Sequence, residues 1–206
     1  MRTSLIIIDD FLDNARAFRD SILQLDFPED HRPKGYPGRN SAVRIQIPGL
    51  EQEISRIVQE PLRAKTEAGH GGARITLEGD KGMADVHIDP GYWSGILYLS
   101  RPEDCQGGTD LFRHKATGTE RACLEKNDLE ALGVTDPQEA NKIFNEILLN
   151  DTHNAEAWER TMRVPMRFNR LVLIRPWLWH TAGPGFGTNL ENGRLIYLLF
   201  FDHAGG

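Results

Sequence analysis

Short segments with the alternating or fully apolar pattern of β-strands occur in two blocks of this chain, and they constrain its fold more than any other feature. The first block covers residues 73–77, 83–89, 95–100 and 109–112, and the second covers 168–175, 178–181 and 195–201. Glycine, proline, aspartate and serine separate the segments, as expected for tight turns between strands. Many short strands with such turns are typical of a sandwich, jelly roll or barrel.

Helical periodicity precedes the first block. A strand at residues 5–8 is followed by apolar side chains spaced three and four apart, which predicts an amphipathic helix over 11–25 with Asp13 at its N-cap. An alternating strand is expected at 42–47, and a second amphipathic helix at about 50–58. The fold class is therefore α+β, mainly β with amino-terminal flanking helices.

A helical insertion is expected between the two blocks, from about residue 117 to 166. Apolar residues within 143–148 follow helical spacing, and the segment around Trp158 is rich in alanine and glutamate. An insertion of this length is long enough to cover the mouth of the β structure as a lid. Trp158, Arg160 and Arg163 are then candidates to face a pocket.

Composition restricts the class of protein. The chain has 206 residues, of which 39% are apolar and 26% charged, and its formal net charge is −6. These values fit a single globular domain over 1–206 and argue against a membrane span or nonspecific nucleic-acid binding. The first ten residues do not resemble a signal peptide, so we expect a cytoplasmic location. Cys105 and Cys123 lack CxxC spacing and are expected to be reduced.

Three residues form a candidate metal site. His87 and Asp89 are two apart in an expected strand, so both side chains leave the same face. His180, from a later strand, completes two histidines and one carboxylate, the facial set that leaves positions on iron open for substrate and dioxygen. The other histidines, His31, His70, His114, His153 and His203, have no second ligand at metal spacing. An HxD tripeptide alone is a weak signal, and its surroundings decide its meaning.

Residues 85–201 resemble the prolyl 4-hydroxylase-like branch of the Fe(II)/2-oxoglutarate-dependent oxygenase superfamily. The motifs that carry the resemblance are HID at 87–89, ILYLS at 96–100, GGTDLF at 107–112, RLVLIRPWLWHTAGPG at 170–185 and GRLIYLLFF at 193–201. Five landmarks in the same order are far more specific than any one of them. The remaining parts look closest to a small bacterial subfamily of unassigned substrate. The resemblance implies a double-stranded β-helix, which is a cupin-like jelly roll.

The resemblance also implies the reaction and the metal ligands. His87, Asp89 and His180 would hold Fe(II), and 2-oxoglutarate and dioxygen would be consumed with release of succinate and carbon dioxide. Relatives that halogenate have a small residue in place of the aspartate, so Asp89 favours hydroxylation of an unactivated carbon.

Two further residues match positions that hold the cosubstrate in the family. Arg194 lies at the family's place for the basic residue that binds the far carboxylate of 2-oxoglutarate, and a guanidinium can do so with two parallel hydrogen bonds. Tyr98 matches a tyrosine that donates to the same carboxylate in several relatives, although a packed core tyrosine is the alternative. Many relatives have Ser or Thr two residues after the arginine, where this chain has Ile196.

Substrate contacts are harder to identify from the sequence. Tyr92 and Trp93 follow the HxD segment closely, and Arg113 leaves the GGTDLF strand beside two other basic residues. With Trp158 they are candidates for a substrate pocket, while packing or a solvated edge is the alternative for each. A lid would favour a small molecule or an amino-acid or peptide substrate. The sequence does not indicate an oligomeric state.

Two other functions remain open from the sequence. A cupin-like module that binds metal without oxygenase turnover, or that holds zinc for hydrolysis, has no need for Arg194. A nucleic-acid demethylase of the same superfamily is disfavoured by the acidic balance and by the lack of a basic stretch with interleaved aromatics.

Overall fold

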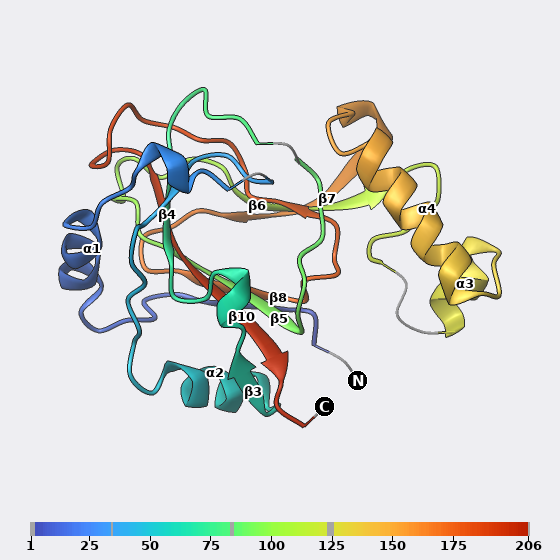
Figure 1. Cartoon of the computed structure of the whole chain (residues 1–206), viewed down its shortest axis with the longest axis horizontal. Coiled ribbons are helices and arrows are strands. Elements are labelled where there is room, and N and C mark those ends of the chain that lie inside the picture. The colour runs from blue at the N-terminus through green and yellow to red at the C-terminus, as the bar shows by residue number, and fades with distance from the viewer. Residues whose placement is uncertain (1–2, 34, 83–84, 123–125, 206) are drawn as a thin grey trace.

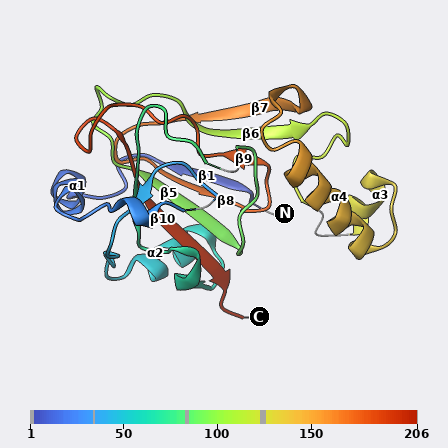
Figure 2. The same ribbon diagram turned by 45° about the horizontal axis from the view of Figure 1, so that its top comes forward.

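The computed structural model describes residues 3–33, 35–82, 85–122 and 126–205. Its antiparallel strands form two facing sheets (Figures 1 and 2). The strands of the larger sheet are β1 (Leu5–Ile8), β2 (Arg39–Asn40), β3 (Leu62–Ala64), β4 (Ala73–Thr76), β5 (Trp93–Tyr98), β8 (Leu171–Ile174) and β10 (Arg194–His203). The strands of the smaller sheet are β6 (Gly108–His114), β7 (Trp158–Pro165) and β9 (His180–Thr181).

The strand order is that of a double-stranded β-helix. The larger sheet runs β1-β8-β5-β10-β4-β2, with β3 pairing beside it on β10, and the smaller sheet runs β7-β6-β9. An isolated bridge between His87 and His180 extends the smaller sheet beyond β9. In this arrangement β4 and β10 face the segment around His87 and β9 across the interior. The α+β jelly roll expected from the sequence is confirmed.

Strand β10 lies at the centre of the larger sheet and is buried on both faces. Leu195 and its alternate neighbours pack in the outer cluster with Ile22 and Ile54, whereas Ile196, Leu198 and Phe200 pack in the inner cluster. Side chains alternate between the faces of a strand, so a strand covered on both sides is apolar at consecutive positions. This explains the uninterrupted apolar run at 195–201.

The amino-terminal helices cover the outer face of the larger sheet. Helix α1 (Ala15–Leu23) contributes Ile22 and helix α2 (Leu50–Val58) contributes Ile54 to the outer cluster. Helix α1 begins later than expected, with Asn14 rather than Asp13 as its N-cap, and the side chain of Asn14 makes no capping hydrogen bond.

Two expected strands do not form. Residues 42–47 have no ladder, because the N–H groups of Ala42 and Ile45 bond to separate segments, at Asp26 and Gly71. Of the expected strand 83–89, residues 83 and 84 lie outside the described part of the chain, and the rest forms only the isolated bridge at His87. Both strands were predicted from apolar alternation alone, and this pattern does not show whether a neighbouring strand is available for pairing.

The insertion is only partly helical. Helices α3 (Lys126–Leu132) and α4 (Pro137–Asn150) confirm the helical prediction there, but 158–165 is strand β7, paired along all of β6. Its side chains between Trp158 and Val164 are exposed, so the segment has no alternation to mark it as a strand. Short 3-10 helices occupy Glu29–His31, Thr66–Ala68 and Ala155–Ala157.

Helices α3 and α4 lie beyond the ends of β6 and β7, to one side of the sheets (Figure 1). The buried face of α4 packs through Phe144 on Trp158 and Trp179. Trp179 and Val86 each precede a histidine of the candidate metal site, so their side chains leave the opposite face of the chain. The helices therefore pack on the outer side of the smaller sheet rather than over its interior.

Two further expectations concern cysteines and membranes. Cys105 is a free thiol, and Cys123 lies outside the described residues. Within the described part of the chain, none of the helices has the length and apolar character needed to cross a bilayer.

Candidate metal centre

The side chains of His87, Asp89 and His180 converge in the interior. One ligand atom from each lies within 4.8 Å of the others. Asp89 Oδ1 is 3.7 Å from His87 Nε2, and Asp89 Oδ2 is 3.4 Å from His180 Nε2. The spacing suits a single ion between two imidazole nitrogens and a carboxylate.

Backbone hydrogen bonds bring the two histidines together and orient their rings. His87 and His180 exchange N–H to carbonyl bonds of 2.9 and 3.0 Å across the bridge. The Nδ1 atom of His87 lies 2.8 Å from the carbonyl oxygen of Asp85, and that of His180 lies 2.8 Å from the carbonyl oxygen of Leu178. Each Nδ1 can donate to its carbonyl, which fixes the tautomer that leaves the lone pair on Nε2 for a metal.

Asp89 is held by hydroxyl groups and kept charged. The hydroxyl of Tyr36 donates to Oδ1 at 2.5 Å, and that of Ser94 donates to Oδ2 at 3.4 Å. Burial alone would raise the pKa of Asp89, but the hydrogen bond and charge of His180, with the charge of His87, bring it well below its usual value. Burial and the charge of Asp89 raise the pKa of Tyr36, so its hydroxyl stays a donor.

The two imidazoles differ in their preference for a proton. Burial, followed by the charge of His180, lowers the pKa of His87 to about 4. Burial also disfavours a charge on His180, but its hydrogen bond with Asp89 prevails and raises its pKa. His87 is therefore neutral and ready to act as a ligand at neutral pH.

Arg194 is a buried cation with unsatisfied donors. Its side chain begins β10 on the inner face of the larger sheet, and the residue is 1% exposed. Its Nε and Nη2 atoms have no hydrogen-bond partner among the described residues. Burial lowers its pKa. Such donors are costly to bury unless an anion completes them, so the position fits a carboxylate.

Hydroxyl groups surround this guanidinium. The ring of Tyr98 lies 5.8 Å from the guanidinium carbon of Arg194, and its hydroxyl is 2.6 Å from Thr109 Oγ1. Thr76 lies directly opposite Arg194 in the pairing of β10 with β4. The side chain of Thr76 therefore leaves the same face as that of Arg194 and carries a hydroxyl. Ile196, at the position where many relatives have Ser or Thr, carries none. Thr76 was missed because a cross-strand neighbour has no fixed spacing in the sequence.

Tyr92 and Trp93, the predicted aromatic pair after Asp89, pack around the ion pair between Arg175 and Glu60. Trp93 is fully buried, and its indole donates to Glu60 at 2.7 Å. The hydroxyl of Tyr92 donates to the same carboxylate at 3.1 Å. Arg175 forms the ion pair with Glu60 and lies 4.0 Å from the Trp93 ring and 4.4 Å from the Tyr92 ring. These contacts favour the packing alternative for both aromatic residues.

The other substrate candidates also have partners of their own. Arg113 pairs with Glu120 at 2.5 Å and with Glu159 at 3.2 Å. Trp158 is buried against Trp179, with ring centroids 5.2 Å apart.

Two arginines of β7 share one carboxylate. Both Nε and Nη2 of Arg163 donate to Asp110 at 2.6 Å, and Arg160 lies 3.5 Å from the same carboxylate. Among the described residues, neither arginine forms an ion pair or hydrogen bond with His87, Asp89 or His180.

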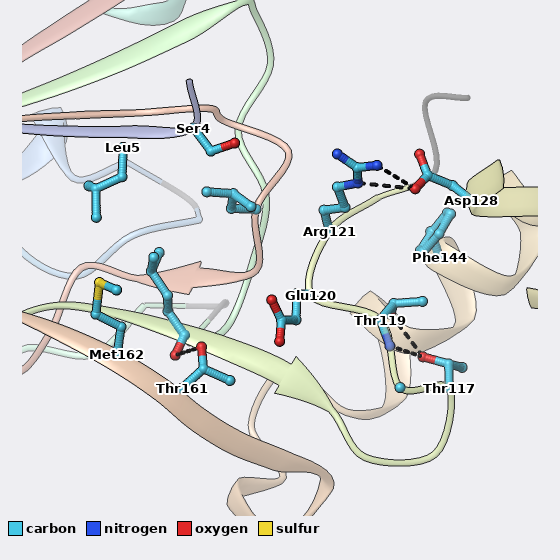
Figure 3. Close-up of a pocket in the computed structure, with 13 residues that line it drawn as sticks. Ser4, Leu5, Thr117, Thr119, Glu120, Arg121, Asp128, Phe144, Thr161 and Met162 are labelled. Atoms are coloured by element: carbon cyan, nitrogen blue, oxygen red, sulfur yellow. Dashed lines mark hydrogen bonds and ion pairs between the residues drawn. The ribbon is translucent and has the colours of Figure 1, made fainter. Parts of the chain in front are cut away.

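A separate cavity of about 580 Å³ lies between the start of β1, the β6 and β7 strands and the loop 117–121 (Figure 3). Arg121 donates to Asp128 at 2.7 Å on one wall, and the hydroxyl of Thr161 donates to the carbonyl of Leu111 at 3.2 Å on another. The lining contains neither the metal triad nor Arg194. This cavity is thus distinct from the candidate metal centre.

The solved structures that resemble the chain include those of HygX and SnoK. HygX from Streptomyces hygroscopicus, crystallised with nickel, 2-oxoglutarate and hygromycin B, is 15% identical with a TM-score of 0.51, over 98% of this chain and 84% of HygX. SnoK, a non-heme alpha-ketoglutarate-dependent carbocyclase from nogalamycin biosynthesis, is 13% identical with a TM-score of 0.51, over 98% and 80%. At this identity the likeness establishes the fold alone. No curated protein matches the sequence.

One family model covers the part of the chain that carries the metal centre. It matches residues 83–201, which include His87, Asp89, His180 and Arg194 and leave out both amino-terminal helices. The match spans more than half of the chain. The chain therefore belongs to this family, which is described as a family of unknown function, DUF6445.

Proposed function

We propose that the protein is an Fe(II)- and 2-oxoglutarate-dependent dioxygenase, with His87, Asp89 and His180 as iron ligands and Arg194 as the residue that binds the far carboxylate of 2-oxoglutarate. The observation that carries the proposal is the pairing of two features in one interior. A triad of ligand atoms within 4.8 Å faces the same space as a buried guanidinium with unsatisfied donors. A plain metal-binding module has no use for the second feature, so it is the weaker explanation.

The donor set fits the metal and the cosubstrate. When bound, Fe(II) with 2-oxoglutarate and dioxygen supplies the oxidative decarboxylation to succinate and carbon dioxide that accompanies hydroxylation of an unactivated carbon. The chain's own residues orient these groups. Asp85 and Leu178 set the imidazoles through their carbonyls, Tyr36 holds Asp89, and Arg194 fixes the direction of the cosubstrate. The apolar inner cluster excludes water beside them.

The finer assignment is hydroxylation of a small molecule or an amino-acid-like substrate, in the prolyl 4-hydroxylase-like branch. Asp89 supplies the carboxylate that halogenating relatives lack. The fold is shared with HygX, whose crystals contain hygromycin B, a small molecule, and with SnoK, a carbocyclase. A nucleic-acid substrate is disfavoured by the net charge of −6.

Anaerobic titration of Fe(II) and 2-oxoglutarate tests the proposal. The wild type should develop the visible charge-transfer band of an iron-bound keto acid, and 2-oxoglutarate should be converted to succinate once oxygen is admitted. Arg194→Gln should weaken 2-oxoglutarate binding by about 10- to 100-fold, because a charged hydrogen-bonded pair contributes roughly 1.5–3 kcal/mol. Arg63→Gln, on an exposed arginine of β3, is the matched control. A wild type with no band would overturn the proposal.

A further inference from the structure

Arg74 is a second buried arginine in the interior. It lies on β4, and Arg194 pairs in register with Thr76 two residues further along the same strand. Residues two apart on a strand share a face, so Arg74 and Arg194 are diagonal neighbours on the inner side of the sheet. Arg74 is 8% exposed. Two buried guanidinium groups side by side repel each other, and such an arrangement is costly without anions to offset it.

Arg74 has no acidic partner. Its Nε donates to Asn40 Oδ1 at 2.8 Å. Among the described residues, no carboxylate lies within ion-pair distance of its guanidinium, and its two Nη atoms have no hydrogen-bond acceptor. The fork of the guanidinium is therefore free to take a planar anion with two parallel bonds.

Arg74 contacts the ring of Tyr36, and that ring contacts the candidate metal ligand His87. The guanidinium carbon of Arg74 lies 4.8 Å from the centroid of the Tyr36 ring. The ring of Tyr36 in turn packs edge-on against His87, with centroids 4.8 Å apart, and its hydroxyl binds Asp89. A molecule held by Arg74 would therefore lie beside the candidate iron centre.

A cavity of about 310 Å³ leads to Arg74. It reaches the inner face of the sheet at Arg74 and Leu198, and its outer part is lined by His31, Arg32 and Arg44. No aspartate or glutamate is among the described residues that line it. Arg44 is bonded to the carbonyl of Thr66 and, within the described chain, has no carboxylate partner. Arg32 pairs with Glu29 and Asp80. Arg74 and Arg44 are therefore the arginines of this cavity that lack a carboxylate partner among the described residues, and they are suited to attract an anion in a chain of net charge −6.

We propose that this cavity binds the anionic group of the oxygenase substrate, so that the substrate is a small carboxylic acid held by Arg74 beside the iron. The inference rests on the proposed function and specifies its substrate class. If the metal ligands and Arg194 hold 2-oxoglutarate as proposed above, the charge of Arg74 is left for a second, separate anion. The planar fork of a guanidinium binds a carboxylate with two parallel hydrogen bonds.

Two measurements on the same variants test the assignment. The first is 2-oxoglutarate affinity, from the anaerobic charge-transfer titration. Arg74→Gln should bind 2-oxoglutarate within about threefold of the wild type, whereas Arg194→Gln should not. Equal weakening in both variants would show that Arg74 belongs to the cosubstrate site and would overturn the proposal.

The second measurement is the melting temperature of the protein saturated with Ni(II) and 2-oxoglutarate. Acetate replaces chloride in the buffer at matched ionic strength. Acetate at about ten times its dissociation constant should raise the Tm of the wild type and of Arg63→Gln by about 3–6 °C and leave Arg74→Gln unchanged. A larger Arg74-dependent response to sulfate than to acetate would assign the site to a tetrahedral anion and overturn the assignment to a carboxylic acid. An acetate response that is absent from the wild type, or equal in Arg74→Gln, would refute the anion site.

Two controls keep the outcomes separate. Arg74→Lys is the alternative variant if Arg74→Gln does not fold. It retains the charge but loses the guanidinium fork, so its acetate response should be smaller than that of the wild type. The same acetate titration on metal-free protein separates the two proposals. An Arg74-dependent shift in a protein that never takes up iron would contradict the oxygenase assignment and leave the anion site standing.

Discussion

Tyr36 is the residue whose role is clearest from contacts alone. Its hydroxyl donates to Asp89 at 2.5 Å, and its ring packs on His87. Tyr36→Phe keeps the ring and removes the donor, so we expect metal affinity to fall by about 10-fold, at the low end for loss of a partner that orients a ligand. Competition titration with a chromophoric chelator measures it. Unchanged affinity would mean that Ser94 and the histidines alone orient the carboxylate.

His70 should make stability depend on pH. It is 3% exposed and packs edge-on against Phe201, and burial lowers its pKa. Below about pH 6.5 the unfolded chain takes up a proton that the folded chain resists, so stability present above that pH is lost as the pH falls. The charges of Glu51 and Arg44 act on the same ring in opposite directions.

The His70 contribution is isolated by comparison with a variant. Urea unfolding of metal-free protein at pH 7.5 and 5.5 should show a larger loss of unfolding free energy for the wild type than for His70→Gln. The difference should not exceed about 1.4 kcal/mol per pH unit, which is the limit for one proton. Equal losses in the two proteins would assign the pH dependence to other groups.

The sequence predicted the metal triad, Arg194 and Tyr98, and it missed Tyr36, Thr76 and Arg74. The triad was chosen by ligand type and spacing, and Arg194 and Tyr98 by the resemblance to the oxygenase superfamily; the fold brings all five to one interior. Their roles in binding iron and 2-oxoglutarate stay predictions.

Tyr36 and Arg74 had no such signal. Tyr36 comes from an irregular loop 53 residues before Asp89, where no periodicity fixes a direction. Arg74 lies in a strand that was predicted, but its burial depends on which strands flank β4. Pairing partners are decided by the whole chain and cannot be read from local pattern.

At the scale of elements, Phe144 is the aromatic residue through which helix α4 packs on the smaller sheet. Phe144 is buried, with its ring centroid 5.8 Å from that of Trp179. Phe144→Ala should lower the unfolding free energy by about 3–4 kcal/mol, the usual cost of removing a buried phenylalanine. Leu149→Ala, on the same helix but 81% exposed, should change it by less than about 0.5 kcal/mol. Urea unfolding of both variants provides the comparison, and similar effects would contradict the packing described.

The elements themselves were predicted unevenly. Strands with a long apolar run, such as β8 and β10, were confirmed because burial on both faces leaves a clear pattern. Strand β7 was taken for a helix, since five consecutive exposed side chains carry no period of two. Residues 42–47 alternate like a strand but meet no neighbour that offers a ladder. Local pattern identifies a strand only where a sheet buries it.

For the whole molecule, a bound metal should stabilise the fold, because the three ligands come together only when the His87–Asp89 segment pairs with β9. Ni(II) at about one hundred times its dissociation constant adds roughly 2.7 kcal/mol, which corresponds to a rise in Tm of about 5–10 °C for a chain of this size. Differential scanning calorimetry with and without EDTA measures the shift. His180→Ala should abolish most of it. A shift of the same size in that variant would place the ion elsewhere.

The central position of β10 has a consequence for biosynthesis. This strand pairs with β3, β4 and β5, all of which leave the ribosome long before residues 194–203 do. Until those residues emerge, the edges of β4 and β5 that pair with β10 stay open, whereas the smaller sheet that carries the triad does not depend on β10. A nascent chain that stalls near residue 190 would therefore present unpaired strand edges and be prone to aggregate.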